Sequence, residues 1–182
     1  MIIFRRISFI FLLLLHLIFI ASVGLNQEHS YSSWVLICIM AGLIGLAYYK
    51  TPRSETTHTA GDILIILFAI IGATTTYLVN LKFETGSVLA AAGIGLLGSF
   101  LPDIKKDSNI LKSLPAAIYC GTFTGMTSPM LAEGIEFILI SGSLTGLLLV
   151  MSKNILIGFG GKLGTVAFGG VTTTSIIMYL LA

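Results

Sequence analysis

The sequence has 182 residues, of which 55% are hydrophobic and only 10% are charged, and its mean hydropathy is +1.00. Soluble globular proteins are about 25% charged, so this composition excludes an ordinary soluble enzyme, a disordered chain and a nucleic-acid-binding protein with a basic face. It predicts an all-α protein whose main partner is the lipid bilayer.

Seven apolar stretches are long enough, or nearly long enough, to cross a membrane. A helix needs about 20 apolar residues to span a hydrocarbon layer of about 30 Å. Seven such helices use almost the whole chain, so we expect a single integral membrane domain, residues 1–182, folded as a polytopic transmembrane helix bundle. The predicted spans are Ile7–Gly24, Trp34–Tyr49, Gly61–Asn80, Ser87–Leu101, Leu114–Leu131, Ile135–Met151 and Leu163–Leu181.

The first stretch has two interpretations. Arg5 and Arg6 precede an unbroken apolar run, and small residues follow it at Ala21–Gly24, as they do in a cleaved signal peptide. The run is long for a signal peptide. We therefore favour an uncleaved N-terminal anchor over residues 1–25, followed by a six-helix core over residues 34–182.

The basic residues predict which side of the membrane each turn occupies. Lys and Arg collect in cytoplasmic loops near span ends. With the N-terminus inside, every basic residue except Lys82 falls in a cytoplasmic turn. The fifth and seventh stretches are rich in Gly and Thr and could instead be re-entrant, but a re-entrant fifth stretch would move Lys153 and Lys162 outside. We expect seven spans, the N-terminus in the cytoplasm and the C-terminus outside. Short loops and the lack of an Asn-x-Ser/Thr acceptor favour a bacterial inner membrane.

The six-helix core is interpreted as one helical hairpin used three times. One alternative is an inverted repeat of three plus three helices, common in transporters. The other is that the matches arise by chance in a hydrophobic chain rich in Gly, Leu and Thr. In each hairpin a small-residue segment precedes a basic turn and then a hydroxyl-rich segment. These paired segments are residues 41–46 with 72–76, 93–98 with 125–128, and 142–147 with 169–174.

Glycines recur three or four residues apart within several spans. At that spacing they share one helix face, and small residues let helix backbones approach closely in lipid. Packing is therefore the favoured role, and a backbone opened to bind a solute is the alternative. The glycines predicted to pack are Gly42, Gly45, Gly95, Gly98, Gly121, Gly125, Gly142 and Gly146.

Hydroxyl side chains cluster in the three spans predicted to run outward. Three consecutive threonines spread about 200° around a helix, so they cannot all bond one neighbour. One hypothesis is a polar path for a small solute or ion, and the other is that each hydroxyl bonds a carbonyl of its own helix. The candidate path residues are Thr74, Thr75, Thr76, Thr122, Thr124, Thr127, Ser128, Thr172, Thr173 and Thr174.

Ionisable side chains are scarce within the spans. His16 is the central exception, and no carboxylate partner for it is visible in the sequence, while Asp62 is expected at the cytoplasmic interface. Without an acid–base pair or a metal-ligand spacing, we expect no enzyme activity, no catalytic residue, no cofactor and no metal. Glu133 and Glu136 share a helix face and are candidates for an outer mouth, or they sit in solvent beside a helix N-terminus.

The favoured function is transport or channel-like conduction of a small solute or ion. The alternative is a non-transporting membrane subunit, possible also as a homo-oligomer, that anchors or signals to a soluble cytoplasmic partner. Threonines that converge on a cavity favour transport, whereas threonines that contact separate neighbours favour the subunit. The partner of such a subunit would dock on Lys105, Lys106, Lys112, Lys153 and Lys162.

Overall fold

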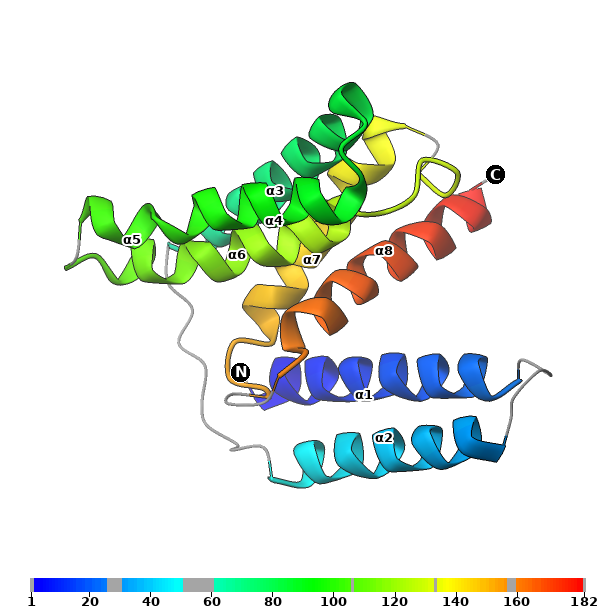
Figure 1. Ribbon diagram of the computed structural model, residues 1–182. Helices are drawn as coiled ribbons and strands as arrows, with labels where there is room; N and C mark the ends of the chain where they lie inside the picture. Colours follow the sequence, from blue (N-terminus) through cyan, green and yellow to red (C-terminus); the bar gives the residue numbers. More distant parts are fainter. Residues whose placement is uncertain are drawn as a thin grey trace.

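The computed structural model (Figure 1) describes residues 2–25, 31–50, 61–105, 107–132, 134–156 and 160–181. These residues form helices and connecting turns and contain no strand. The helices are α1 (Ile2–Leu25), α2 (Tyr31–Lys50), α3 (Asp62–Phe83), α4 (Ser87–Ser99), the single-turn α5 (Leu101–Ile104), α6 (Asn109–Gly125), α7 (Ile135–Met151) and α8 (Lys162–Leu181).

Four of the helical segments are long and apolar enough to cross a membrane. They are Arg6–Leu25, Asp62–Phe83, Ser87–Ile104 and Lys162–Leu181, where the third joins α4 to α5. The prediction of an all-helical chain with membrane-length apolar helices is thereby confirmed. Shorter apolar segments lie within α2 and α7.

Helix α6 is displaced toward the N-terminus from the predicted fifth span, Leu114–Leu131. It begins after Ser108, whose Oγ accepts a hydrogen bond from the Leu111 amide at 3.4 Å, the bond of an N-cap residue. Pro115 lies inside the helix. The error arises because a cap and a polar first turn determine where this helix starts, whereas the prediction followed only the apolar run.

Helix α3 is the centre of the bundle and packs against α4, α6 and α7. Gly121 of α6 lies against Ala69 of α3, and Gly125 lies against Ala73, so α3 and α6 run in the same direction. Helix α7 runs the opposite way, and α8 packs on both α6 and α7. Helix α1 joins this group through α7 and α8 (Figure 1).

The predicted hairpin repeat is only partly formed. The pairs α4–α6 and α7–α8 pack together, but in the described residues α2 contacts no helix except α1. The first hairpin, α2 with α3, is therefore not a packed unit. The inverted repeat would require α2 to pack on α7 as α6 packs on α3, and this contact is missing too. Sequence similarity between segments did not specify their partners.

The helix directions bring most of the described lysines to one end of the bundle, which we call the basic end. Helices α1, α3, α6 and α8 begin there, and α2, α5 and α7 end there (Figure 1, left). Lys82, near the end of α3, lies at the opposite end. The lysines within four residues of the helix ends at the basic end are Lys50, Lys105, Lys112, Lys153 and Lys162.

Candidate functional site

Six of the eight glycines predicted to pack lie in close contacts between helices. A Cβ atom added to Gly121 would collide with the carbonyl oxygen of Ala69, and one added to Gly146 would lie 2.7 Å from the Ile66 Cα. Only a glycine fits at such positions, because the facing backbone cannot move aside. The six glycines are Gly95, Gly98, Gly121, Gly125, Gly142 and Gly146.

Gly42 and Gly45 do not pack in this way, which corrects the prediction for α2. A Cβ added to either would meet no atom of the described residues within 4 Å. The face of α2 turned toward α1 instead carries Ile44, Ala47 and Tyr48. Since these side chains lie on the other side of the helix, the two glycines are exposed.

The candidate path residues do not form one continuous row. Thr75 lines a groove of about 250 Å³ between α3, α4 and α6 whose other lining residues are apolar or glycine. Ser128 is exposed, and its Oγ accepts a hydrogen bond from the Met130 amide at 3.2 Å. Thr172 is half-buried on α8. Six of the ten candidates donate to a carbonyl oxygen three or four residues earlier: Thr75, Thr122, Thr124, Thr127, Thr173 and Thr174.

Five hydroxyl residues of α3, α6, α7 and α8 are fully buried, and we call them the hydroxyl cluster: Thr76, Thr124, Ser141, Thr145 and Thr174. Helices α3 and α8 each pack on α6 and on α7. The Oγ1 atoms of Thr124 and Thr145 lie 2.9 Å apart, so one donates to the other across the α6–α7 contact. Among the described residues, the hydroxyl oxygens of Thr76 and Ser141 have no hydrogen-bond partner. The Oγ1 atom of Thr74, two residues before Thr76 on α3, is also buried and has no partner in this part of the chain.

Glycines on two neighbouring helices make room for the hydroxyl cluster. A Cβ on Gly170 of α8 would collide with Thr145 Oγ1, and a Cβ on Gly125 of α6 would lie 2.8 Å from the Thr76 Cβ. Sequence analysis did not select Ser141 or Thr145 as site residues. Both lie beside Gly142 and Gly146, in a segment that the sequence analysis interpreted only as a packing face. Ser141 and Thr145 are four residues apart and so share one face of the helix, and this spacing was the signal that could have identified them.

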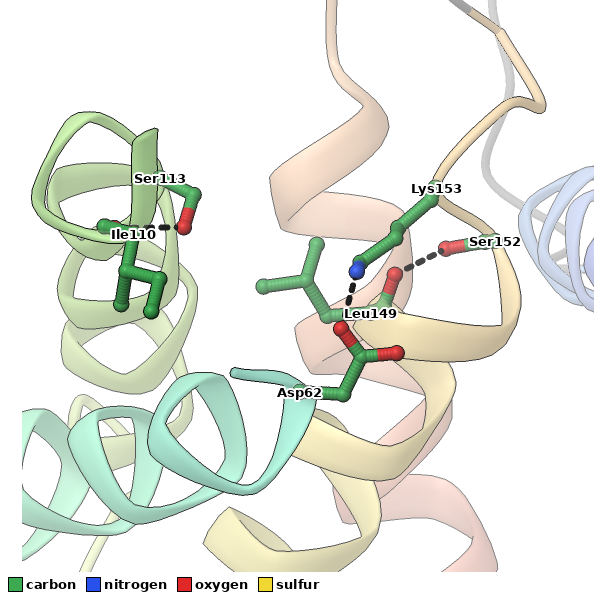
Figure 2. A network of polar contacts seen from close by, with 6 residues as sticks. All are labelled: Asp62, Ile110, Ser113, Leu149, Ser152 and Lys153. Atoms are coloured by element: carbon green, nitrogen blue, oxygen red, sulfur yellow. Dashed lines mark hydrogen bonds and ion pairs between the residues drawn. The ribbon is translucent and has the colours of Figure 1, made fainter. Parts of the chain in front are cut away.

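An ion pair joins α3 to the end of α7 at the basic end. Lys153 Nζ donates to Asp62 Oδ1, and the exposed fractions of the two side chains are 27% and 11% (Figure 2). Asp62 is the first residue of α3, and Lys153 follows the last turn of α7. Neither charge is therefore fully hydrated, and each contributes to holding the two helix ends together.

Lys162 contacts the turn that follows α7. Its Nζ donates to the carbonyl oxygens of Ser152 and Lys153, at 2.6 and 2.9 Å. Both carbonyls belong to the turn that follows α7, and Lys162 is the first residue of α8, so the lysine ties this turn to the start of α8. Of the lysines proposed to dock a partner, Lys153 and Lys162 bond within the chain, Lys105 and Lys112 are exposed, and Lys106 lies outside the described residues.

A cavity of about 180 Å³ opens beside the ion pair, between the beginnings of α3 and α6. In Figure 2 the Lys153 ammonium group lies over the Asp62 carboxylate, and α6 faces it across a gap. Ser113 Oγ donates to the Ile110 carbonyl oxygen at 2.7 Å on the α6 side. The lining includes Asp62, Ile65, Asn109, Ile110, Ser113 and Lys153.

Of the two acidic residues proposed for an outer mouth, only Glu136 lies within the described residues. Glu136 is exposed in the first turn of α7, at the end of the bundle opposite the basic end. Glu133 lies outside the described residues.

His16 has partners on two other helices that sequence reasoning missed. Its Nδ1 lies 2.9 Å from the Leu12 carbonyl oxygen and 3.0 Å from the Tyr48 hydroxyl, and its Nε2 lies 3.1 Å from Thr165 Oγ1. These bonds link α1 to α2 and α8 without any carboxylate. Because the partners are neutral and far away in sequence, no spacing rule identifies them.

Neither a metal centre nor a known relative assigns a role to these residues. Within the described ranges, no three His, Cys, Asp or Glu side chains come together as a metal site would require. No protein-family model, curated protein or solved structure matches the chain. The polar features from which a function can be argued are the ion pair with its cavity, the hydroxyl cluster and the His16 contacts.

Proposed function

We propose that this chain is a multi-pass protein of the cytoplasmic membrane that carries a small polar solute or ion across the bilayer. The observation that carries the proposal is the pair of unpartnered hydroxyls, Thr76 and Ser141, inside the hydroxyl cluster. Burying a hydroxyl without a hydrogen bond costs about 1–3 kcal/mol in proteins. Valine or alanine would avoid this cost in a purely structural bundle, whereas a polar solute passing between α3 and α7 would bond both oxygens.

The proposed topology keeps seven membrane-crossing segments, with the N-terminus in the cytoplasm and the C-terminus outside. The basic end supports it, because lysines and arginines are retained on the cytoplasmic side. In this orientation Lys105 and Lys153 face the cytoplasm and Lys82 faces outward. Cysteines introduced at these three positions test the assignment with a reagent that cannot cross the membrane.

The arrangement also supports a closed state of such a transporter. The ion pair between Asp62 and Lys153 joins α3 to the end of α7, between the cytoplasm and the hydroxyl cluster. Opening toward the cytoplasm requires the two helix ends to separate. Transport by alternating access would then couple the breaking of this pair to the movement of a solute past the cluster.

Flux into proteoliposomes tests the proposal. We expect at least one of radiolabelled alanine, propionate, ethylamine and rubidium ion to enter faster than into protein-free liposomes. The double variant Thr76→Val/Ser141→Ala should lose this flux and yet unfold at equal or higher denaturant concentration, because it removes unpartnered hydroxyls. Thr173→Val is the matched control, since Thr173 bonds its own helix. No flux of any of the four probes through folded protein contradicts the proposal.

A second candidate function is a membrane subunit that does not transport. It is favoured by the threonines that bond their own helices, and by the exposed Lys105 and Lys112 at the basic end. Such a subunit would bind a soluble partner there. The flux assay separates the two functions, because a subunit moves none of the probes.

A further inference from the structure

The cavity at the basic end presents both signs of charge to the same small volume. Among its described lining residues, Asp62 supplies a carboxylate and Lys153 supplies an ammonium group, and the two are in contact. An ammonium group has three donors, and only one is needed for Asp62 Oδ1. The pair can therefore bond a further molecule without first separating.

We infer that this cavity binds a small zwitterion, a molecule that carries one ammonium and one carboxylate group. This inference rests on the proposed function and names the class of solute that is moved. The ligand carboxylate accepts hydrogen bonds from Lys153 Nζ, and the ligand ammonium donates to Asp62. The charges of Asp62 and Lys153 balance each other, so a solute with only one charge would bring an unbalanced charge to this partly buried site, and such an imbalance is costly.

The size and the other lining groups of the cavity fit the same class. A volume of about 180 Å³ holds about six water molecules, each of which takes about 30 Å³ in the liquid, or one solute with a similar number of non-hydrogen atoms. Asn109 and Ser113 offer an amide and a hydroxyl for further hydrogen bonds. Ile65 and Ile110 offer an apolar surface to the carbon atoms between the two charged groups.

Equilibrium dialysis of the purified full chain in detergent, at neutral pH, tests the inference with three probes of similar size. Alanine carries both charges, propionate carries only the carboxylate, and ethylamine carries only the ammonium group. We expect alanine to bind at least about tenfold more tightly than either of the others, the discrimination expected when one charged contact is missing. Equal binding of the three, or no binding of alanine, overturns the inference without any variant.

Two charge-removing variants then assign the binding to this cavity. Asp62→Asn should shift the preference toward propionate, and Lys153→Gln should shift it toward ethylamine, because each leaves one charge in the cavity. Lys112→Gln is the matched control, since Lys112 is an exposed residue of α6 at the same end and outside the cavity lining. A shift in Lys112→Gln as large as that in Lys153→Gln overturns the assignment, as does an unchanged preference in both cavity variants.

The outcome for binding is separable from the outcome for transport. Alanine that binds with the expected preference, while none of the four probes enters proteoliposomes, supports the zwitterion site and contradicts transport. Propionate, ethylamine or rubidium ion that enters proteoliposomes, with no alanine binding, supports transport and contradicts the zwitterion site.

Discussion

The contact between α3 and α6 and the contact between α1 and α2 are both made in apolar, glycine-containing helices, but they are built differently. In the first, Gly121 and Gly125 lie directly on the backbone of Ala69 and Ala73. In the second, side chains separate the helices, and the glycines of α2 face outward. Glycine spacing therefore specifies close packing only when a partner helix lies on the face that carries the glycines.

The residues of α1 explain why α2 cannot approach it closely. Phe9 packs its ring edge-on against Tyr48, with ring centroids 5.1 Å apart, and Leu12 is buried beside them. A helix that carries rings and leucines on its contact face holds its neighbour at a distance. In lipid such a contact gains little from apolar burial, because lipid chains are as apolar as leucine. The two regions should accordingly respond differently to substitution.

The largest difference is expected from adding one methyl group to a glycine in each region. Gly121→Ala should destabilise the protein by about 1–3 kcal/mol, because its Cβ meets the Ala69 carbonyl oxygen. Gly42→Ala should be neutral or stabilise α2 by up to about 1 kcal/mol, since alanine favours a helix. Unfolding in mixed micelles, followed by circular dichroism, measures both. Equal destabilisation by the two substitutions would remove the distinction between the regions.

A smaller effect is expected from the hydroxyl pair that crosses from α6 to α7. A double-mutant cycle with Thr124→Val and Thr145→Val should give a coupling energy of about 0.6 kcal/mol and at most about 1.7 kcal/mol. The same cycle with Thr124→Val and Thr173→Val should give none, because Thr173 bonds Gly169 in its own helix. Additive losses in the first cycle would show that the 2.9 Å contact contributes nothing to stability.

An effect of similar size is expected at His16, in the peripheral region. His16→Phe removes the hydrogen bonds to Tyr48 and Thr165 and retains a ring at the contact. We expect a loss of about 0.6 kcal/mol for each bond removed, measured in the same micelles. Thr165→Val should give a smaller loss, and the double variant should cost less than the sum. A loss exceeding that of Gly121→Ala would mean that α1 is not peripheral.

The sequence predicted the helices best where an apolar run ends at a charge or a glycine. The prediction of Ile135–Met151 is identical to α7, and that of Leu163–Leu181 differs from α8 by one residue. The α6 prediction failed because Ser108 and the polar residues Asn109 and Lys112 belong to its start, and a hydropathy argument excludes them. Predicting which helices pack together was harder still, because hydropathy carries no information about which helices are in contact.

The candidate site was predicted in its residue types and not in its contacts. The sequence analysis singled out threonine in these spans, but adjacent threonines differ in their contacts. Among the described residues Thr76 has no hydrogen-bond partner, whereas Thr75 bonds Ile71. The direction of each side chain depends on the neighbouring helix. Asp62 and Lys153 are 91 residues apart, so only the folded chain brings them together.

The ion pair at the basic end has a fixed polarity because of the helices that carry it. Asp62 occupies the first turn of α3, where the helix macrodipole is positive, and Lys153 follows α7 at the negative end of its macrodipole. Each charge is thereby favoured by about 0.3–1 kcal/mol, independently of the other. Exchanging the two residues would keep the contact and set both charges against the peptide dipoles, so the direction in which each helix runs, as well as the contact itself, decides which residue carries which charge.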